Sequence, residues 1–167
     1  MHYLGIAATL LALVTPTAVT ANKPGPLTGV KEVGVLVYLQ HDAATSGLDK
    51  AALQAKAEED LKAAGINVLK YGVKAKYTGP GVLVLTIDIV KWTGHPINAI
   101  NVRGDFMERA AVERAGKPFV EDGSTWQFAN TGLGGDIELK DQIGELVDQT
   151  AILFSREYIA DNQKAVK

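Results

Sequence analysis

The sequence of 167 residues contains no cysteine. Disulfides, thiolate catalysis and thiolate metal sites are therefore excluded. The chain also lacks a dominant charge of one sign, because its formal net charge is -2 and its charged residues are scattered. A nucleic-acid-binding surface needs concentrated positive charge, so we expect no nucleic-acid partner.

The first 21 residues contain no Asp, Glu, Lys or Arg. Within them, Leu4 to Val14 is an apolar run with the length of a signal-peptide core, too short to span a bilayer comfortably. Small residues end the segment, so we predict cleavage after Ala21 and a periplasmic or secreted location. Because only His2 and the free amine supply positive charge before the run, an uncleaved anchor is the alternative.

The remaining chain has the length of one domain that can bury a core without disulfides or metal. We predict a signal peptide over residues 1–21, a flexible mature start over 22–29, one α+β domain over 30–161 and a tail over 162–167. No cysteine follows the apolar run, which excludes a lipid-anchored lipoprotein.

The stretch from Gly81 to Trp92 has the clearest pattern in the chain. Its alternate residues form a wholly apolar side, made of Leu83, Leu85, Ile87 and Ile89. The other side carries Asp88 among valines, which is typical of a half-covered or water-facing sheet surface. The asymmetry predicts a strand in a two-layer domain whose helices cover one face only.

The other predicted elements are recognised by the same periodicities. Strands are expected over 30–40, 66–71, 97–114 and 124–129, and helices over 48–64 and 137–161. Turns are expected over 71–80, 93–96, 116–118 and 121–123, a bulge or a change of strand partner near 110–112, and a glycine-rich loop over 131–135. Together they predict an α+β two-layer sandwich in the order β-α-β-β-β-(β)-α, with a mostly antiparallel sheet of four or five strands and two helices on one face.

Several local features carry a resemblance to known proteins. They are the valine-alternating first strand, the helix end Ala64-Gly65-Ile66-Asn67-Val68, the hairpin, Thr125-Trp126, and a final helix with Phe154, Tyr158 and Asn162. This layout resembles small exported bacterial proteins, the lipopolysaccharide-assembly lipoprotein and the amino-terminal domain of the Tol system's periplasmic propeller protein. The resemblance implies a non-catalytic envelope domain that holds a partner, and it carries over no functional residue.

A mixed charged and apolar cluster is the most useful site hypothesis. If the hairpin pairs as predicted, Asp88, Arg103 and Asp105 lie on the sheet face opposite the helices, together with Met107 and Tyr38. The structural alternative is cross-strand charge pairing on a wetted face. The functional interpretation is a surface that docks a protein or lipid-linked partner.

Three polar residues give a rival hypothesis. His41 and Asp42 follow the first strand, and His95 lies in the hairpin turn. If they meet at one end of the sheet, they form the pocket of a periplasmic hydrolase or small-ligand-binding protein. The simpler interpretation places all three in solvated loops, and their spacing implies neither a nucleophile nor a metal site.

Two further patterns have weak functional signals. Gly132 to Gly135 precede a helix as in a phosphate-binding loop, but the required lysine and hydroxyl are missing and Asp136 places a negative charge there. Trp92 and Trp126 could stack on a ligand, although an aromatic residue in a strand more often fills a core or shields an edge.

The leading hypothesis is an exported, non-enzymatic domain of the cell envelope. It binds a protein or lipid-linked partner through its open sheet face or its edge, and it needs no cofactor and no metal. The hydrolase or ligand-binding protein is the rival, and a self-associating structural protein is a third hypothesis. The sequence identifies no catalytic residue.

Overall fold

The computed structural model describes residues 25–69, 81–114 and 117–164. Its elements are β1 (Val33–His41), the 3-10 helix η1 (Asp42–Thr45), α1 (Lys50–Ala63), β2 (Val68–Leu69), β3 (Val82–Lys91), β4 (Ile97–Arg114), β5 (Lys117–Gly135) and α2 (Leu139–Lys164). The predicted signal peptide and the turn over 71–80 lie outside the described residues.

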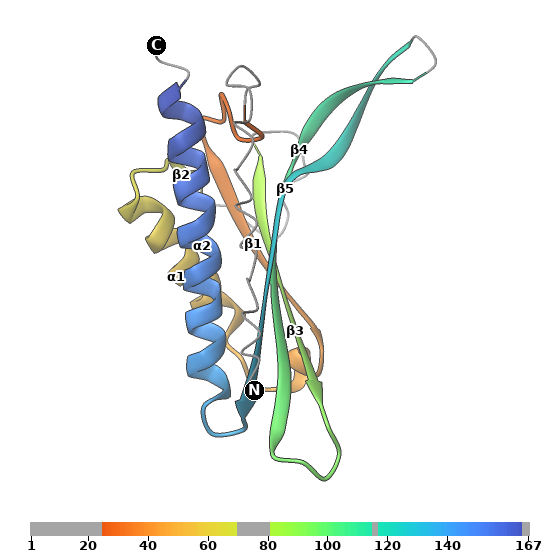
Figure 1. Cartoon of the computed structure of the whole chain (residues 1–167), viewed down its shortest axis with the longest axis vertical. Coiled ribbons are helices and arrows are strands. Elements are labelled where there is room, and N and C mark those ends of the chain that lie inside the picture. Colours follow the sequence, from red (N-terminus) through yellow and green to blue (C-terminus); the bar gives the residue numbers. More distant parts are fainter. Residues whose placement is uncertain (1–24, 70–80, 115–116, 165–167) are drawn as a thin grey trace, which may run out of the picture.

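The strands form one five-stranded sheet in the order β2-β1-β3-β4-β5. Both α1 and α2 lie on the same side of this sheet (Figure 1). The predicted α+β two-layer fold with two helices on one face is confirmed. The sheet is mixed, because β1 runs parallel to β2 and β3, whereas β3, β4 and β5 are antiparallel neighbours. The connection from β1 through α1 provides the crossover that parallel strands need.

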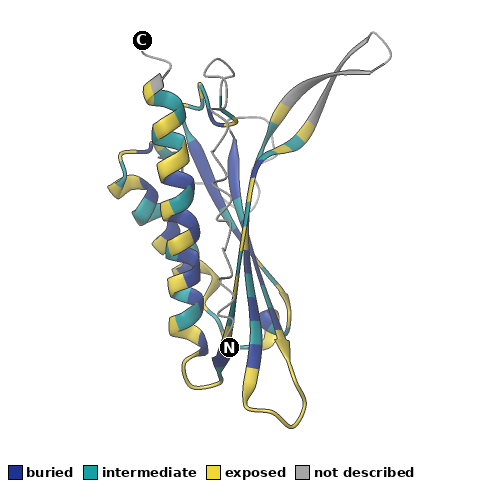
Figure 2. Cartoon of the chain, in the orientation of Figure 1, coloured by how far each residue is buried: buried dark blue, intermediate teal, exposed yellow. Residues whose placement is uncertain are grey.

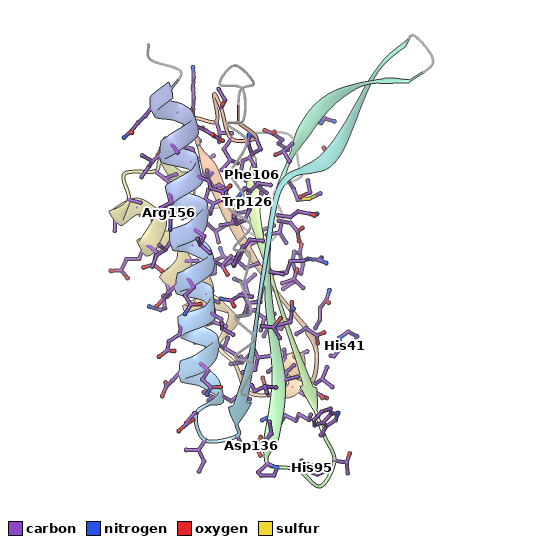
Figure 3. The ribbon with its side chains drawn as sticks, viewed as in Figure 1. His41, His95, Phe106, Trp126, Asp136 and Arg156 are labelled. Carbon is purple, nitrogen blue, oxygen red and sulfur yellow. The ribbon has the colours of Figure 1, made fainter. Side chains whose placement is uncertain are left out.

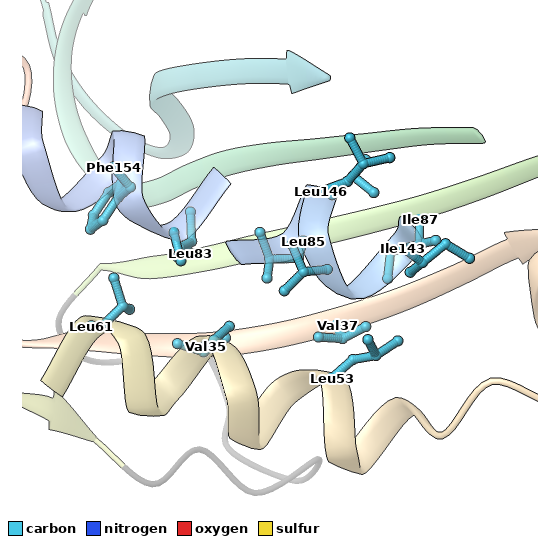
Figure 4. Packing of buried hydrophobic residues seen from close by; sticks show 14 of the residues in the cluster. Val35, Val37, Leu53, Leu61, Leu83, Leu85, Ile87, Ile143, Leu146 and Phe154 are labelled. Atoms are coloured by element: carbon cyan, nitrogen blue, oxygen red, sulfur yellow. The ribbon is translucent and has the colours of Figure 1, made fainter. Parts of the chain in front are cut away.

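The core lies between the sheet and the two helices. The predicted apolar side of β3 is fully buried there, together with alternate residues of β1 and β4 (Figures 2 and 4). On the helices, Leu53 and Leu61 of α1 and Ile143, Val147 and Phe154 of α2 complete this layer. The period of two in the strands and the periods of three and four in the helices therefore meet in one core.

Helix α1 has well-defined ends. The side chain of Asp49 accepts hydrogen bonds from the amides of Ala51 and Ala52, which have no partner inside the helix. Gly65 has a positive φ of 82°, as predicted for a left-handed cap. The next amide, that of Ile66, donates to the carbonyl of Leu61 over 3.0 Å. Helix α1 therefore stops where the chain must turn toward β2.

The segment before β1 packs against the end of α2. Leu27 is fully buried in the core, and its amide donates to Asp161 Oδ2 over 3.1 Å. Asn162 Nδ2 donates to the Leu27 carbonyl over 2.9 Å, and Tyr158 Oη donates to the Val30 carbonyl over 2.8 Å. Residues 22–29 were expected to be flexible. The part of this segment that the structure describes, residues 25–29, is held by hydrogen bonds to the last helix. Burial raises the pKa of the Tyr158 phenol.

The β4–β5 hairpin is longer than the sheet that it joins. Pairing with β3 ends at Met107, so from Glu108 onward the described partner of β4 is β5, and the hairpin extends past the sheet (Figure 1). The one register shift lies between Phe106 and Met107.

Three sequence predictions in this region are wrong. The last strand is not confined to 124–129, because β5 runs from Lys117 to Gly135 and includes the glycine-rich stretch. The turn expected over 121–123 is continuous paired strand, and so is the loop expected over 131–135. No bulge lies at 110–112, but the alternative expectation there, a change of partner, agrees with the end of pairing between β3 and β4 at Met107. Two long strands that pair throughout satisfy each other's backbone groups, and this pairing outweighs the local turn preference of glycine.

Candidate functional site

The face of the sheet opposite α1 and α2 has no described helix on it, and we call it the open face. The strand register places its side chains in rows across four strands. One row reads Leu36, Val84, Asp105 and Gln127, the next reads Tyr38, Thr86, Arg103 and Ala129, and the third reads Gln40, Asp88, Asn101 and Thr131. Each row therefore joins residues that are far apart in the sequence.

An open depression of about 540 Å³ occupies the first two rows of the open face. Its lining comes from β1, β3, β4 and β5 and consists of Leu36, Tyr38, Val84, Thr86, Arg103, Asp105, Met107, Asp122, Ser124 and Gln127. Four residues of the predicted cluster, Tyr38, Arg103, Asp105 and Met107, thus line one depression. Apolar side chains and charged groups meet there, as the sequence hypothesis required.

Arg103 and Asp105 form an ion pair inside the depression. Their side chains share a face because they are two residues apart on β4, and Arg103 Nε donates to Asp105 Oδ2 over 2.7 Å. Asp105 has 6% of its surface exposed, whereas 56% of the Arg103 side chain is exposed. The guanidinium therefore covers a buried carboxylate. Arg103 lines the depression, and its two terminal nitrogens donate no hydrogen bond to another described residue.

Tyr38 forms the β1 side of the depression. The Lys50 ammonium, from the first residue of α1, lies 5.2 Å from the centre of the Tyr38 ring. Among the described residues, β2 pairs only with Val33 and Gly34, and no described strand pairs with the outer edge of β1 beyond them. A second cation is thus held beside the depression by a cation–π contact.

Asp88 does not line the depression, although the sequence grouped it with Arg103. Its Oδ1 lies 2.9 Å from His41 Nδ1. His41 ends β1 with a positive φ of 47°, the one positive φ among the described residues other than glycine. Asp88 and His41 therefore form a separate pair in the third row of the open face.

The residues of the rival hypothesis have different partners. Asp42 Oδ2 accepts a hydrogen bond from the Lys91 amide over 3.0 Å, so it fixes η1 to the end of β3. The His95 ring lies 6.4 Å from the Trp92 ring in the β3–β4 turn. Figure 3 shows His41 and His95 well apart. Among the described residues, no group of three His, Asp or Glu side chains could hold a metal ion.

A second surface on the open face was not predicted from the sequence. Val90, Ala99 and Leu133 are paired neighbours across β3, β4 and β5, and Ile97 and Trp92 continue the patch at the same end of the sheet. Apart from Ala99, all are exposed, with 65% of Trp92 and 70% of Leu133 accessible. We call this patch the apolar end. Finding it from the sequence would have required the register of all three strands.

The other two weak signals have structural explanations. Trp126 is buried, and its Nε1 donates to Glu157 Oε2 over 2.7 Å. Gly132 and Gly134 lie in β5 beneath α2, where the side chains of Leu146 and Gln142 would meet an added Cβ. Both glycines are paired strand residues under α2, so they do not form a phosphate-binding loop. Asp136 accepts a hydrogen bond from Asn98 Nδ2 over 2.9 Å.

The described part of the chain contains no helix that is both long and apolar enough to cross a membrane. No protein-family model matches the sequence, and no curated protein is similar to it. Among solved structures, the chain is similar to PelC dodecamers from Paraburkholderia phytofirmans. A point variant of PelC has a TM-score of 0.47 and 14% identity, over 77% of this chain and 90% of PelC. A second PelC structure has a TM-score of 0.43 and 14% identity, over 79% and 88%.

Proposed function

We propose that this chain is an exported, non-enzymatic domain of the cell envelope that binds a protein or lipid-linked partner through the open face of its sheet. The observation that carries the proposal is the depression, where Arg103 covers a buried carboxylate between apolar walls. Concave surfaces that combine apolar area with a few oriented polar groups are typical binding sites.

A binding role is favoured over a chemical one by the arrangement of the titratable groups. His41 pairs with Asp88, Asp42 holds a backbone amide, and His95 lies in the turn beside Trp92. Catalysis by these groups would need a base, a nucleophile and an oriented third group within hydrogen-bond reach of one another. The described contacts support no such set.

The open face is tested by site-specific crosslinking in the native host. A photoreactive amino acid replaces Gln127, which is exposed on the lining of the depression, and a control protein carries it at Ile152 on α2. We expect a discrete adduct from position 127 and none from position 152. Replacing Arg103 and Met107 by alanine in the first protein should leave the fold intact and weaken the adduct. An unchanged adduct would exclude the depression as the docking site.

Export is tested separately by identifying the first residue of the protein after cell fractionation. We expect the chain to start at Asn22 in the periplasm or the medium, because cleavage is predicted after Ala21. A chain that keeps Met1 and sediments with membranes would support the anchor alternative. A chain that keeps Met1 in the cytoplasm would contradict export.

A further inference from the structure

The chemistry of the depression restricts what can fill it. Its wall on β1 and β3 is formed by Leu36, Val84 and the Tyr38 ring, with Met107 opposite on β4. The volume of about 540 Å³ falls in the range of about 300–1,000 Å³ that is usual for small-molecule sites. The apolar wall and the volume together fit one short chain or ring system.

The lining of the depression has one cation, Arg103, and two carboxylates, Asp105 and Asp122, and two more cations, Arg109 and Lys50, lie beside it. Asp105 accepts a hydrogen bond from Arg103 Nε, and the exposed Asp122 lies 3.6 Å from Arg109, so each lining carboxylate has a cationic neighbour. The outer nitrogens of Arg103 donate a hydrogen bond to no other described residue. Lys50 contacts the Tyr38 ring and forms no ion pair with a described residue. Arginine presents these nitrogens as a planar fork that matches phosphate and carboxylate oxygens.

We propose that the depression binds a single amphiphile whose anionic head group is held by the outer nitrogens of Arg103 and whose apolar chain lies along Leu36, Val84 and Met107. This inference rests on the proposed function, because it places a ligand on the same open face, and it names the chemical class of that ligand. Lys50 adds a second positive charge beside the head group. The ligand is taken up as a free molecule, since a concave site of this volume holds one chain and not a bilayer surface.

The test uses two probes with the same chain and opposite charge. Dodecyl phosphate and dodecyltrimethylammonium are titrated into residues 22–167 by calorimetry, below the concentrations at which they form micelles. We expect saturable binding of one dodecyl phosphate and at least about tenfold weaker binding of the cation, because one charge-assisted contact is worth about a factor of ten. Equal binding of both probes, or binding of neither, would overturn the proposal without any variant.

The head-group contact is tested with a matched pair of arginine variants. Arg103→Gln keeps a donor for Asp105 but removes the charge, and we expect it to weaken dodecyl phosphate about tenfold. Arg156→Ala removes an exposed arginine from α2, on the other side of the sheet (Figure 3), and should have no effect. An equal effect of both variants would show that net charge, and not the depression, attracts the probe.

The outcomes separate this inference from the proposed function. If neither probe binds but the adduct from position 127 still depends on Arg103 and Met107, the open face docks a macromolecule and the amphiphile is excluded. If dodecyl phosphate binds and no adduct forms, the depression is a ligand site and the docking proposal is wrong. If dodecyl phosphate does not bind and no adduct forms at position 127, both proposals are wrong.

Discussion

The two faces of β3 differ although they belong to the same ten-residue strand. The side chains of Leu83, Leu85, Ile87 and Ile89 point toward the helices and are all completely buried. On the open face, Val82 and Thr86 are buried, Asp88 is half-buried and Val90 is exposed. One face therefore contributes uniform packing that stabilises the fold, and the other changes from buried at Val82 to exposed at Val90.

The packed face depends on an aromatic cluster as well as on aliphatic residues. The Phe154 ring lies 5.1 Å from Trp126 and 5.4 Å from Phe106, measured between ring centres. These residues come from α2, β5 and β4, so the cluster joins the last helix to the β4–β5 edge of the sheet on its covered face. We therefore expect substitutions in the core to lower the free energy of unfolding much more than substitutions on the open face.

The largest effect is expected from Phe154→Ala. The variant leaves a cavity between Trp126 and Phe106, and it should lower the free energy of unfolding by about 3–5 kcal/mol. Urea denaturation followed by circular dichroism measures it. Ile152→Ala, an exposed position on the same helix, is the control and should change stability little. Similar losses for both variants would contradict the packing described for α2.

A smaller loss is expected from Gly104→Ala on the covered side of β4. A Cβ at this position would come within 2.7 Å of the Thr150 methyl and 3.1 Å of the Trp126 ring, so α2 or the strand must shift. Overpacking of this kind costs about 1–3 kcal/mol. Gly123→Ala, where no atom lies close, is the matched control. A neutral Gly104→Ala would mean that α2 packs less closely on β4 than described.

A pH-dependent effect is expected where α1 meets α2. Burial raises the pKa of the Asp60 carboxyl, and repulsion from Asp148 adds to the shift. Because the folded protein binds this proton more tightly than the unfolded chain, ionised Asp60 destabilises the fold, and stability from this group falls as pH rises from its ordinary pKa through the raised one.

The variant that tests this relation is Asp60→Asn. It should be more stable than the natural protein at pH 7 and lose its advantage as the solution is acidified below the ordinary pKa of an aspartate. Thermal unfolding over a pH series measures the difference. Glu145→Gln, an exposed position on α2, is the control. A stability difference that does not change with pH would exclude the proposed titration.

The smallest effect is expected at the apolar end of the open face. Leu133→Ser should change the free energy of unfolding by no more than about 0.5 kcal/mol, because most of the side chain is already in water. Urea denaturation against Ile87→Ser, a buried position, provides the contrast. A loss above about 1 kcal/mol would show that the open face contributes to the core and would weaken the comparison between the faces.

Much of the fold was predictable because the residues with the strongest hydrophobic periodicity are also the ones that form the core. The alternation in β3 placed its apolar side correctly, and Gly65 correctly marked the end of α1. The extent of β5 was missed because Gly132 and Gly134 are typical of loops. In the structure, these two glycines lie in paired strand next to α2. No local sequence signal reveals a contact with a later helix.

The candidate site was predictable in part for a similar reason. Alternation along β4 placed Arg103, Asp105 and Met107 near one another, and the first strand supplied Tyr38. Asp88 shares the open face with them, as predicted, but its contact with His41 was not foreseen because it depends on the parallel register between β1 and β3. The register between two strands depends on which strands become neighbours in the tertiary structure, so the pattern of a single strand does not determine it.

The placement of the two tryptophans gives this molecule two separate optical reporters. The Trp126 indole is 5% exposed and bonded to Glu157, whereas the Trp92 indole stands mostly in solvent in the β3–β4 connection. A collisional quencher such as iodide should therefore extinguish the emission of Trp92 long before that of Trp126. Binding of a molecule at the apolar end should shield Trp92 from the quencher. Unfolding of the helix layer should instead expose Trp126, so one unlabelled sample distinguishes the two events.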